Sequence, residues 1–286
     1  MLQVSMGALV SLVIIMLVCF VLPFLLFYIL YRYADGRVKT FLIGAVAYLV
    51  TGVIIDTSIA ALFDQLGGIK TNNALYLLYA VVFSPICFVL VNYLIIKRFG
   101  KDNMKTTGDS FMYSLGYSSA LNILSTGLLA LMYFLSLLEI KNKSGSLIVV
   151  SDADYVSMSD VVSGSNLVNE TIYQEMSKLC AEPVSYYMVF IVKCLWVIVA
   201  LSAIMMVIGL AVKKVNKLIL LAFAFVIRLF ITLPDIFDRF NVIKNVWISQ
   251  LISVIILVIV WVAAFFCRRM FIDTEDSSEE EKEKVN

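Results

Sequence analysis

Histidine is absent from the sequence, and charged residues are scarce. Without histidine, the chain lacks the commonest metal ligand and the commonest general base. Charged residues make up 15% of the chain, whereas a soluble protein carries about 25%. The 62% share of hydrophobic residues therefore predicts an integral membrane protein. Basic stripes with interleaved aromatic residues are also missing, so the sequence indicates no nucleic-acid partner.

Cysteine is infrequent and follows no metal-binding or redox pattern. Four of the five cysteines lie in or at the ends of apolar runs, and only Cys180 lies in a long polar loop. Because no CxxC spacing occurs, we interpret all five as structural or incidental thiols and expect no metal centre and no cofactor. The five are Cys19, Cys87, Cys180, Cys194 and Cys267.

Seven apolar segments are long enough to cross a bilayer. A hydrocarbon core of about 30 Å needs about 20 helical residues, and a helix satisfies its own backbone hydrogen bonds in lipid. We therefore predict an all-α polytopic transmembrane helix bundle over residues 1–272, in which Pro234 ends the sixth span. The predicted spans are 5–31, 41–63, 74–96, 110–138, 185–212, 217–233 and 243–266.

Lysine and arginine are concentrated after the first, third, fifth and seventh predicted spans. Because basic loops stay in the cytoplasm, we expect the N-terminus outside and the C-terminus inside. The long loop 139–184 is then extracellular, and its alternating apolar and polar residues predict a short strand or an amphipathic helix. Residues 273–286 hold seven acidic residues and two lysines and are predicted to form a disordered cytoplasmic tail.

Three ionisable residues interrupt the predicted spans: Asp56, Lys193 and Arg228. Such residues are costly in lipid and indicate a functional site by default. At 1.5 Å per residue they lie roughly 10, 12 and 8 Å below the outer ends of their spans, so we expect one layer in the outer leaflet. Asp56 would then pair with one of the two cations and leave a positive charge for an anionic group. Alternatively, Lys193 and Arg228 extend to the headgroups, and Asp56 pairs with one of them or with nearby hydroxyls.

The fourth span contains the unusual segment "YSLGYSSALNIL", residues 113–124. Hydroxyl side chains, Gly116 and the amide of Asn122 replace the leucines that a lipid-facing helix would carry. Gly116, Ser119 and Ala120 form a small-residue face, which predicts the close approach of a second helix.

The number of spans, the position of the long loop and the segment "KKVNKLILLAFAFVIRLFITLPDIFDRF" resemble the YhfC-type intramembrane metallopeptidases, a family of bacterial polytopic membrane proteins. The resemblance implies a Glu-Glu-x-x-Arg-type element in the third span and a Gly-His-Gly-Gly-x-Glu-type element in the fourth. This chain keeps only the glycine. The corresponding positions are Ser84, Pro85 and Phe88, then Gly116, Tyr117, Ser118, Ser119 and Leu121.

The resemblance therefore implies a degenerate member of the family, without the residues that would bind a metal. Ala200 and Arg228 also stand near places where the family carries further histidines. In this interpretation, Tyr117 and Asn122 fill and hydrogen-bond the emptied site. Metal-assisted hydrolysis needs a set of deprotonated ligands, and an aspartic dyad needs a second membrane carboxylate, so no known proteolytic mechanism fits the sequence.

The leading hypothesis is a non-catalytic binding or accessory protein of the bacterial cytoplasmic membrane. Its partners would be the lipid bilayer and a membrane-embedded peptide or protein, or an anionic ligand held in the span layer. A permease-like subunit of a transporter or exporter is the alternative, although an odd number of spans without an inverted repeat makes it less natural. An active intramembrane peptidase and a seven-span receptor are weaker alternatives.

Overall fold

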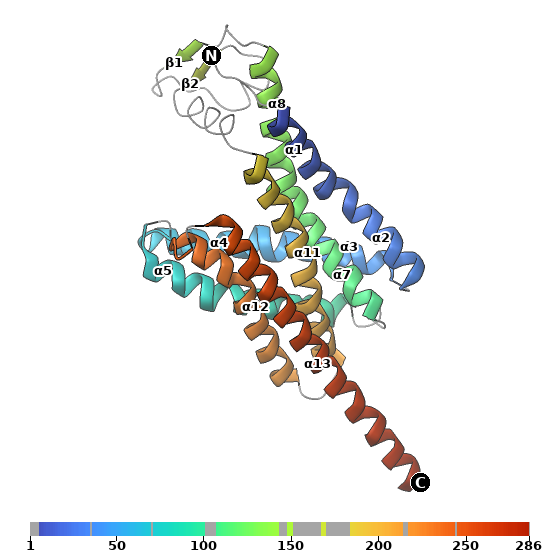
Figure 1. The fold of residues 1–286 in the computed structure, drawn as a ribbon. Coiled ribbons are helices and arrows are strands. Elements are labelled where there is room, and N and C mark those ends of the chain that lie inside the picture. The colour runs from blue at the N-terminus through green and yellow to red at the C-terminus, as the bar shows by residue number, and fades with distance from the viewer. Residues whose placement is uncertain are drawn as a thin grey trace. The chain divides into compact units, whose positions relative to one another are not determined.

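The protein is an all-α membrane protein with seven helices that are long and apolar enough to span a bilayer (Figure 1). The spans agree closely with those predicted from the sequence: Met6–Tyr33, Val38–Gln65, Asn73–Gly100, Gly108–Leu138, Tyr187–Lys213, Lys217–Arg239 and Trp247–Arg269. The computed structural model describes residues 6–34, 36–69, 71–100, 107–142, 148–150, 167–169, 184–213, 217–243 and 245–285. Cys180 and most of the loop 139–184 lie outside this set, and the orientation of the chain in the membrane stays a prediction.

Each of the first four spans combines α-helix with π-helical segments. The first is α1 (Met6–Met16), η1 (Leu17–Val21) and α2 (Leu22–Tyr33), and the second is α3 (Val38–Tyr48), η2 (Leu49–Asp56) and α4 (Thr57–Gln65). The third is α5 (Asn73–Leu78), η3 (Tyr79–Phe83), α6 (Ser84–Ile95) and η4 (Ile96–Gly100). The fourth is α7 (Thr107–Asn122), η5 (Ile123–Gly127) and α8 (Leu128–Asn142).

The remaining elements are three long helices and two short strands. The helices are α11 (Val184–Lys213), α12 (Lys217–Arg239) and α13 (Val246–Val285). The strands β1 (Ile148–Val150) and β2 (Leu167–Asn169) pair in parallel, with Ile148 opposite Leu167. Of the short strand or amphipathic helix predicted in the long loop, the described residues therefore contain two short strands.

The chain divides into two compact units, Met1–Phe24 with Asn122–Leu195 and Leu25–Leu121 with Trp196–Asn286. In the first unit, α1 presents one face to α8 and to the start of α11. The buried residues of this face recur every three or four positions, which is the helical period. They are Ala8, Leu12, Ile15 and Cys19, and they meet Ala130, Leu137, Tyr187 and Cys194.

The core of the second unit is built around the C-terminal part of α11. Residues 203–208 of this helix are all buried, and 61% of its most apolar stretch is buried, against 22–33% for the other spans. Helix α12 packs one face into the same core through Leu220, Ala224, Ile227 and Ile231. Arg228 directly follows Ile227, which is buried in this face, and therefore lies next to the core.

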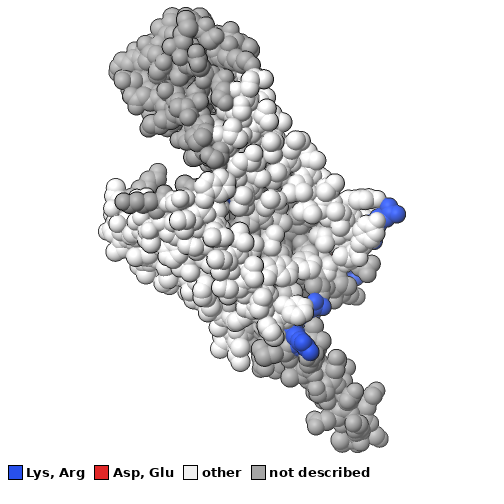
Figure 2. All heavy atoms as spheres, in the orientation of Figure 1, with Lys and Arg blue, Asp and Glu red and all other residues white. Residues whose placement is uncertain are grey.

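The outer surface of the helices is apolar, as contact with lipid requires. Large hydrophobic side chains such as Ile54, Leu94 and Leu218 are more than half exposed. The face in Figure 2 is almost entirely uncharged apart from a few Lys and Arg side chains. These surfaces support contact with a bilayer.

The small-residue face of the fourth span brings α7 close to α3, as predicted. A Cβ atom on Gly116 would collide with the carbonyl oxygen of Phe41, and one on Gly44 would collide with the carbonyl oxygen of Tyr113. Two helices can approach this closely only where side chains are missing on both sides of the contact.

The structure differs from the sequence prediction at the ends of the last two helices. Pro234 does not end the sixth span but lies inside α12, which continues to Arg239. A proline in a membrane helix removes one hydrogen bond, and neighbouring groups can compensate for it. Helix α13 continues to Val285 across the predicted disordered tail. Its many glutamates and lysines are strong helix formers, which explains the continuation.

Candidate functional site

A polar cavity of about 140 Å³ lies within the second unit. Residues from five spans line it, contributed by η2 and its flanking residues, α6, α7, α11 and α12. The lining contains one carboxylate, one guanidinium, several hydroxyls and one thiol. The lining residues are Tyr48, Thr51, Gly52, Asp56, Ser84, Cys87, Phe88, Tyr117, Leu121, Leu201 and Arg228. The volume holds several water molecules, each of which occupies about 30 Å³ in the liquid.

Asp56 reaches this cavity from the last position of η2. It is half-buried, and the hydroxyl of Tyr79 in η3 lies beside its carboxylate. Asp56 and Tyr79 therefore both belong to π-helical segments, η2 of the second span and η3 of the third. π-Helical turns inside α-helices occur frequently at functional sites, because they shift the direction of the side chains that follow.

Arg228 reaches the cavity from the middle of α12. Its guanidinium carbon lies 4.4 Å from the centre of the Phe88 ring, which is a cation–π contact with α6. Its Nε atom is buried and has no hydrogen-bond partner among the residues that the structure describes. Arg228 is half-buried as a whole, but an arginine carries five N–H donors, and a buried donor without an acceptor is costly. This atom is therefore the strongest indication that the cavity receives a partner.

Aromatic rings form part of the cavity wall. Tyr117 is 4% exposed, and its ring meets the rings of Tyr48 and Phe88 edge to face at 5.4 and 5.5 Å. The Thr51 hydroxyl donates to the carbonyl of Ala47. The Tyr117 hydroxyl therefore donates to Thr51 Oγ1, at 2.7 Å. Tyr117 lines the cavity without filling it, which differs from the predicted filling of an emptied pocket.

Asp56 and Arg228 share the cavity, whereas Lys193 is not among its lining residues. Lys193 lies in α11 and belongs to the other unit. Arg228 Nε has no hydrogen-bond partner within the described ranges, so the predicted pairing of Asp56 with a cation is not made through this atom. Because α12 continues to Arg239, Arg228 lies about 16 Å from either helix end. This depth is greater than the roughly 8 Å predicted from the shorter span.

The positions selected by family resemblance fall into two groups. Ser84, Phe88, Tyr117 and Leu121 line the cavity together with the charged pair. The others are Pro85 at the start of α6, Gly116 against α3, and Ser118 and Ser119, whose hydroxyls donate to the Leu115 carbonyl. Asn122 belongs to the first unit, where its amide donates to the carbonyl of Cys194 at 3.2 Å.

Sequence reasoning missed several lining residues on the second span. Tyr48 and Gly52 precede Asp56 by eight and four positions, which places them on the same helix face, and Thr51 precedes it by five. The spacing of Tyr48 and Gly52 from Asp56 was the available signal. Leu201 carried no signal, because one leucine in an apolar helix is unremarkable.

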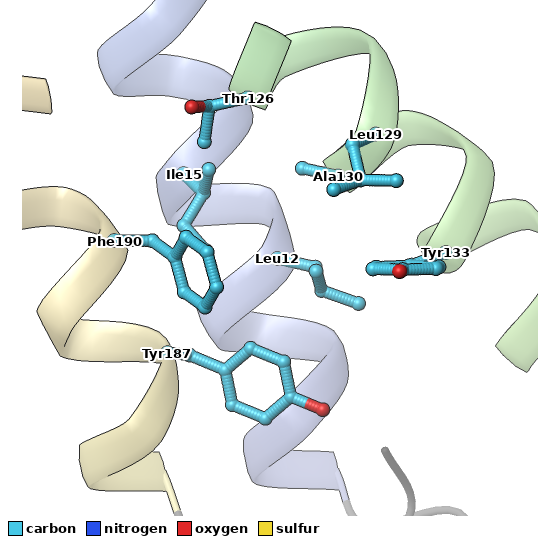
Figure 3. A pocket seen from close by; sticks show the side chains of 8 residues that line it. All are labelled: Leu12, Ile15, Thr126, Leu129, Ala130, Tyr133, Tyr187 and Phe190. Atoms are coloured by element: carbon cyan, nitrogen blue, oxygen red, sulfur yellow. The ribbon is translucent and has the colours of Figure 1, made fainter. Parts of the chain in front are cut away.

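A second, smaller cavity of about 30 Å³ lies in the first unit (Figure 3). The rings of Tyr187 and Phe190 on α11 point toward Leu12 and Ile15 on α1, and Thr126 adds one hydroxyl. Its lining is mainly hydrocarbon. The cavity is therefore a packing gap in an apolar core rather than a site with converging polar groups.

The polar cavity does not fit the metal that the family resemblance implies. Asp56 and Cys87 are the only ionisable groups in the lining that commonly bind zinc, and the guanidinium of Arg228 shares the space and opposes a divalent cation. Within the described ranges, no three Cys, Asp or Glu side chains come together as a metal site.

Comparison with protein-family models, with curated proteins and with solved structures finds no match to this chain.

Proposed function

We propose that this multi-pass membrane protein binds a small anionic group in its polar cavity without cleaving it. The observation that carries the proposal is the buried Nε of Arg228, which finds no hydrogen-bond partner in the described part of the chain, although Arg228 lines a cavity with room for a ligand. A carboxylate or phosphate oxygen is the natural acceptor for a guanidinium N–H, and such a hydrogen bond is strengthened by both charges.

The setting makes this interaction strong. The phenyl ring of Phe88 covers one face of the guanidinium, so the planar edge of Arg228 remains for a ligand. Low-dielectric surroundings strengthen the attraction between the guanidinium and an anion. In this proposal the chain is a degenerate relative of the YhfC-type metallopeptidases in a bacterial membrane, with an arginine where the family binds a metal through histidine.

Thermal unfolding of the purified protein in detergent tests the proposal. Acetate, propionate and phosphate are added separately, with chloride at matched ionic strength as the reference. We expect at least one of the three anions to raise the unfolding temperature, because a ligand that binds only the folded state stabilises it. Arg228→Gln should abolish this response. Lys193→Gln is the matched control and should retain it.

Two results would contradict the proposal. The first is an equal response of the parent protein and Arg228→Gln to every anion. The second is stoichiometric zinc in the purified protein, or cleavage of a membrane-embedded peptide, since either would restore a hydrolytic function.

A further inference from the structure

We infer that the ligand of the polar cavity is a small zwitterion, with an ammonium group at Asp56 and a carboxylate at Arg228, as in a small α-amino acid. This inference rests on the proposed function and deepens it by naming the ligand class. It begins from the charges that line the cavity. Within the described part of the chain, Asp56 and Arg228 are the charged residues of the lining, one of each sign.

A simple anion matches only half of this lining. Bound at Arg228, it would share a cavity of about 140 Å³ with the carboxylate of Asp56 and would be repelled by it. An ammonium group on the same ligand turns this repulsion into attraction. The complex of a zwitterion with the two side chains is also neutral overall, which lowers the cost of holding charge inside a membrane protein.

The two charged side chains are held by different neighbours. The guanidinium of Arg228 stacks on Phe88 of α6, whereas the carboxylate of Asp56 lies beside the hydroxyl of Tyr79 in η3. Both aromatic residues belong to the third span, nine positions apart, and this span therefore contacts both charges. Such fixed contacts keep a charged side chain in place before the ligand arrives and reduce the ordering cost of binding.

The size and depth of the cavity favour a free solute over a lipid headgroup. Several water volumes accommodate a molecule of a few heavy atoms, such as glycine or alanine. Arg228 lies about 16 Å along α12 from either helix end, whereas headgroups lie at the edges of a hydrocarbon core about 30 Å thick. The hydroxyls of Thr51, Ser84 and Tyr117 are further lining groups.

Titration calorimetry of the purified protein with glycine and alanine tests the inference. Acetate and methylamine, which each carry one of the two charges, are titrated in parallel. We expect glycine or alanine to bind, and each half-ligand to bind at least about tenfold more weakly, since each loses one charge-assisted hydrogen-bond partner. Asp56→Asn and Arg228→Gln should each lower the affinity for the amino acid about tenfold or more. Lys193→Gln should leave it unchanged.

Gel-filtration profiles and circular dichroism establish that each variant is folded. Arg228→Lys is the second variant if Arg228→Gln fails to fold; it keeps the charge and should still weaken binding, because it loses the planar guanidinium. If acetate binds as tightly as glycine and Asp56→Asn has no effect, the zwitterion inference is wrong while the anion site of the proposed function stands. If no amino acid binds, and none of acetate, propionate and phosphate binds, both fail. Preferential binding of a short-chain phosphatidylethanolamine would overturn the free-solute assignment.

Discussion

At the scale of single residues, one buried hydrogen bond joins the third and fourth spans beside the cavity. The Tyr113 hydroxyl donates to Asn92 Oδ1 at 2.7 Å, and the Asn92 amide donates to the carbonyl of Phe88 at 2.8 Å. Both polar side chains are fully buried. Asn92 therefore links the interhelical hydrogen bond to the backbone of Phe88, whose ring contacts the guanidinium of Arg228. Asn92 thus supports the cavity wall.

Tyr113→Phe removes this hydroxyl and keeps the ring. We expect a loss of about 0.6 kcal/mol, with an upper bound near 1.7 kcal/mol, as for other interhelical hydrogen bonds in membrane proteins. Unfolding of the purified protein by a denaturing detergent measures the change. The matched control is Tyr93→Phe on the third span, whose ring contacts Lys97 and is retained in the variant. Equal destabilisation by the two variants would show that the bond to Asn92 has no special contribution.

The residues that the sequence could identify were those whose chemistry conflicts with lipid. Asp56 and Arg228 stand out because a charge in an apolar run is expensive, and the structure places both at one cavity. Thr51 and Tyr48 escaped notice because hydroxyl-bearing residues are tolerated in membrane helices, where threonine can bond to its own helix backbone, as Thr51 does with Ala47. That Arg228 Nε finds no hydrogen-bond partner in the described part of the chain results from packing, which the sequence does not reveal.

At the scale of elements, hydropathy located all seven spans because length and apolar composition are read directly from the sequence. The end of α12 was predicted too early, since proline rarely lies within a soluble helix but is tolerated in a membrane helix. The π-helical segments η2 and η3 were not predicted. They depend on which backbone groups pair, and no residue pattern in those segments specifies an i to i+5 bond.

The contact between α7 and α3 gives the prediction for this scale. Gly116→Ala should destabilise the protein by about 1–3 kcal/mol, as overpacking of a tight contact does. The new methyl group would collide with the Phe41 carbonyl, which belongs to a helix backbone and cannot rotate away. The control is Gly127→Ala, whose methyl group would meet side-chain atoms of Cys19 and Phe20 at 3.1–3.2 Å. The Phe20 ring can shift, and the contact with Cys19 Cβ is much longer than the one that Gly116→Ala would make, so we expect a smaller loss in the same unfolding assay. A larger loss would contradict the contact model.

At the scale of the whole molecule, the orientation of the spans follows from charge alone and needs an independent measurement. The alternation of basic loops predicts that the loop 139–184 is outside and that the C-terminal end is inside. Cys180 is a native probe of this loop, because the other four cysteines lie in spans. A membrane-impermeant maleimide should therefore label the parent protein in intact spheroplasts, and Cys180→Ser should lose the label.

A test of the predicted cytoplasmic location of the C-terminal end requires an introduced cysteine. In the Cys180→Ser background, Ser277→Cys places a cysteine in the acidic C-terminal segment, and we expect labelling only after the membrane is permeabilised. Labelling of Ser277→Cys in intact spheroplasts, together with no labelling of Cys180 in the parent protein, would reverse the predicted topology. The cavity proposal would survive that reversal, because Arg228 lies eleven residues from each end of α12. Asp56 lies nine residues from Gln65 and eighteen from Val38, so it is nearer to the Gln65 end of the second span. A reversed topology would therefore change the side of the membrane from which a solute has to enter.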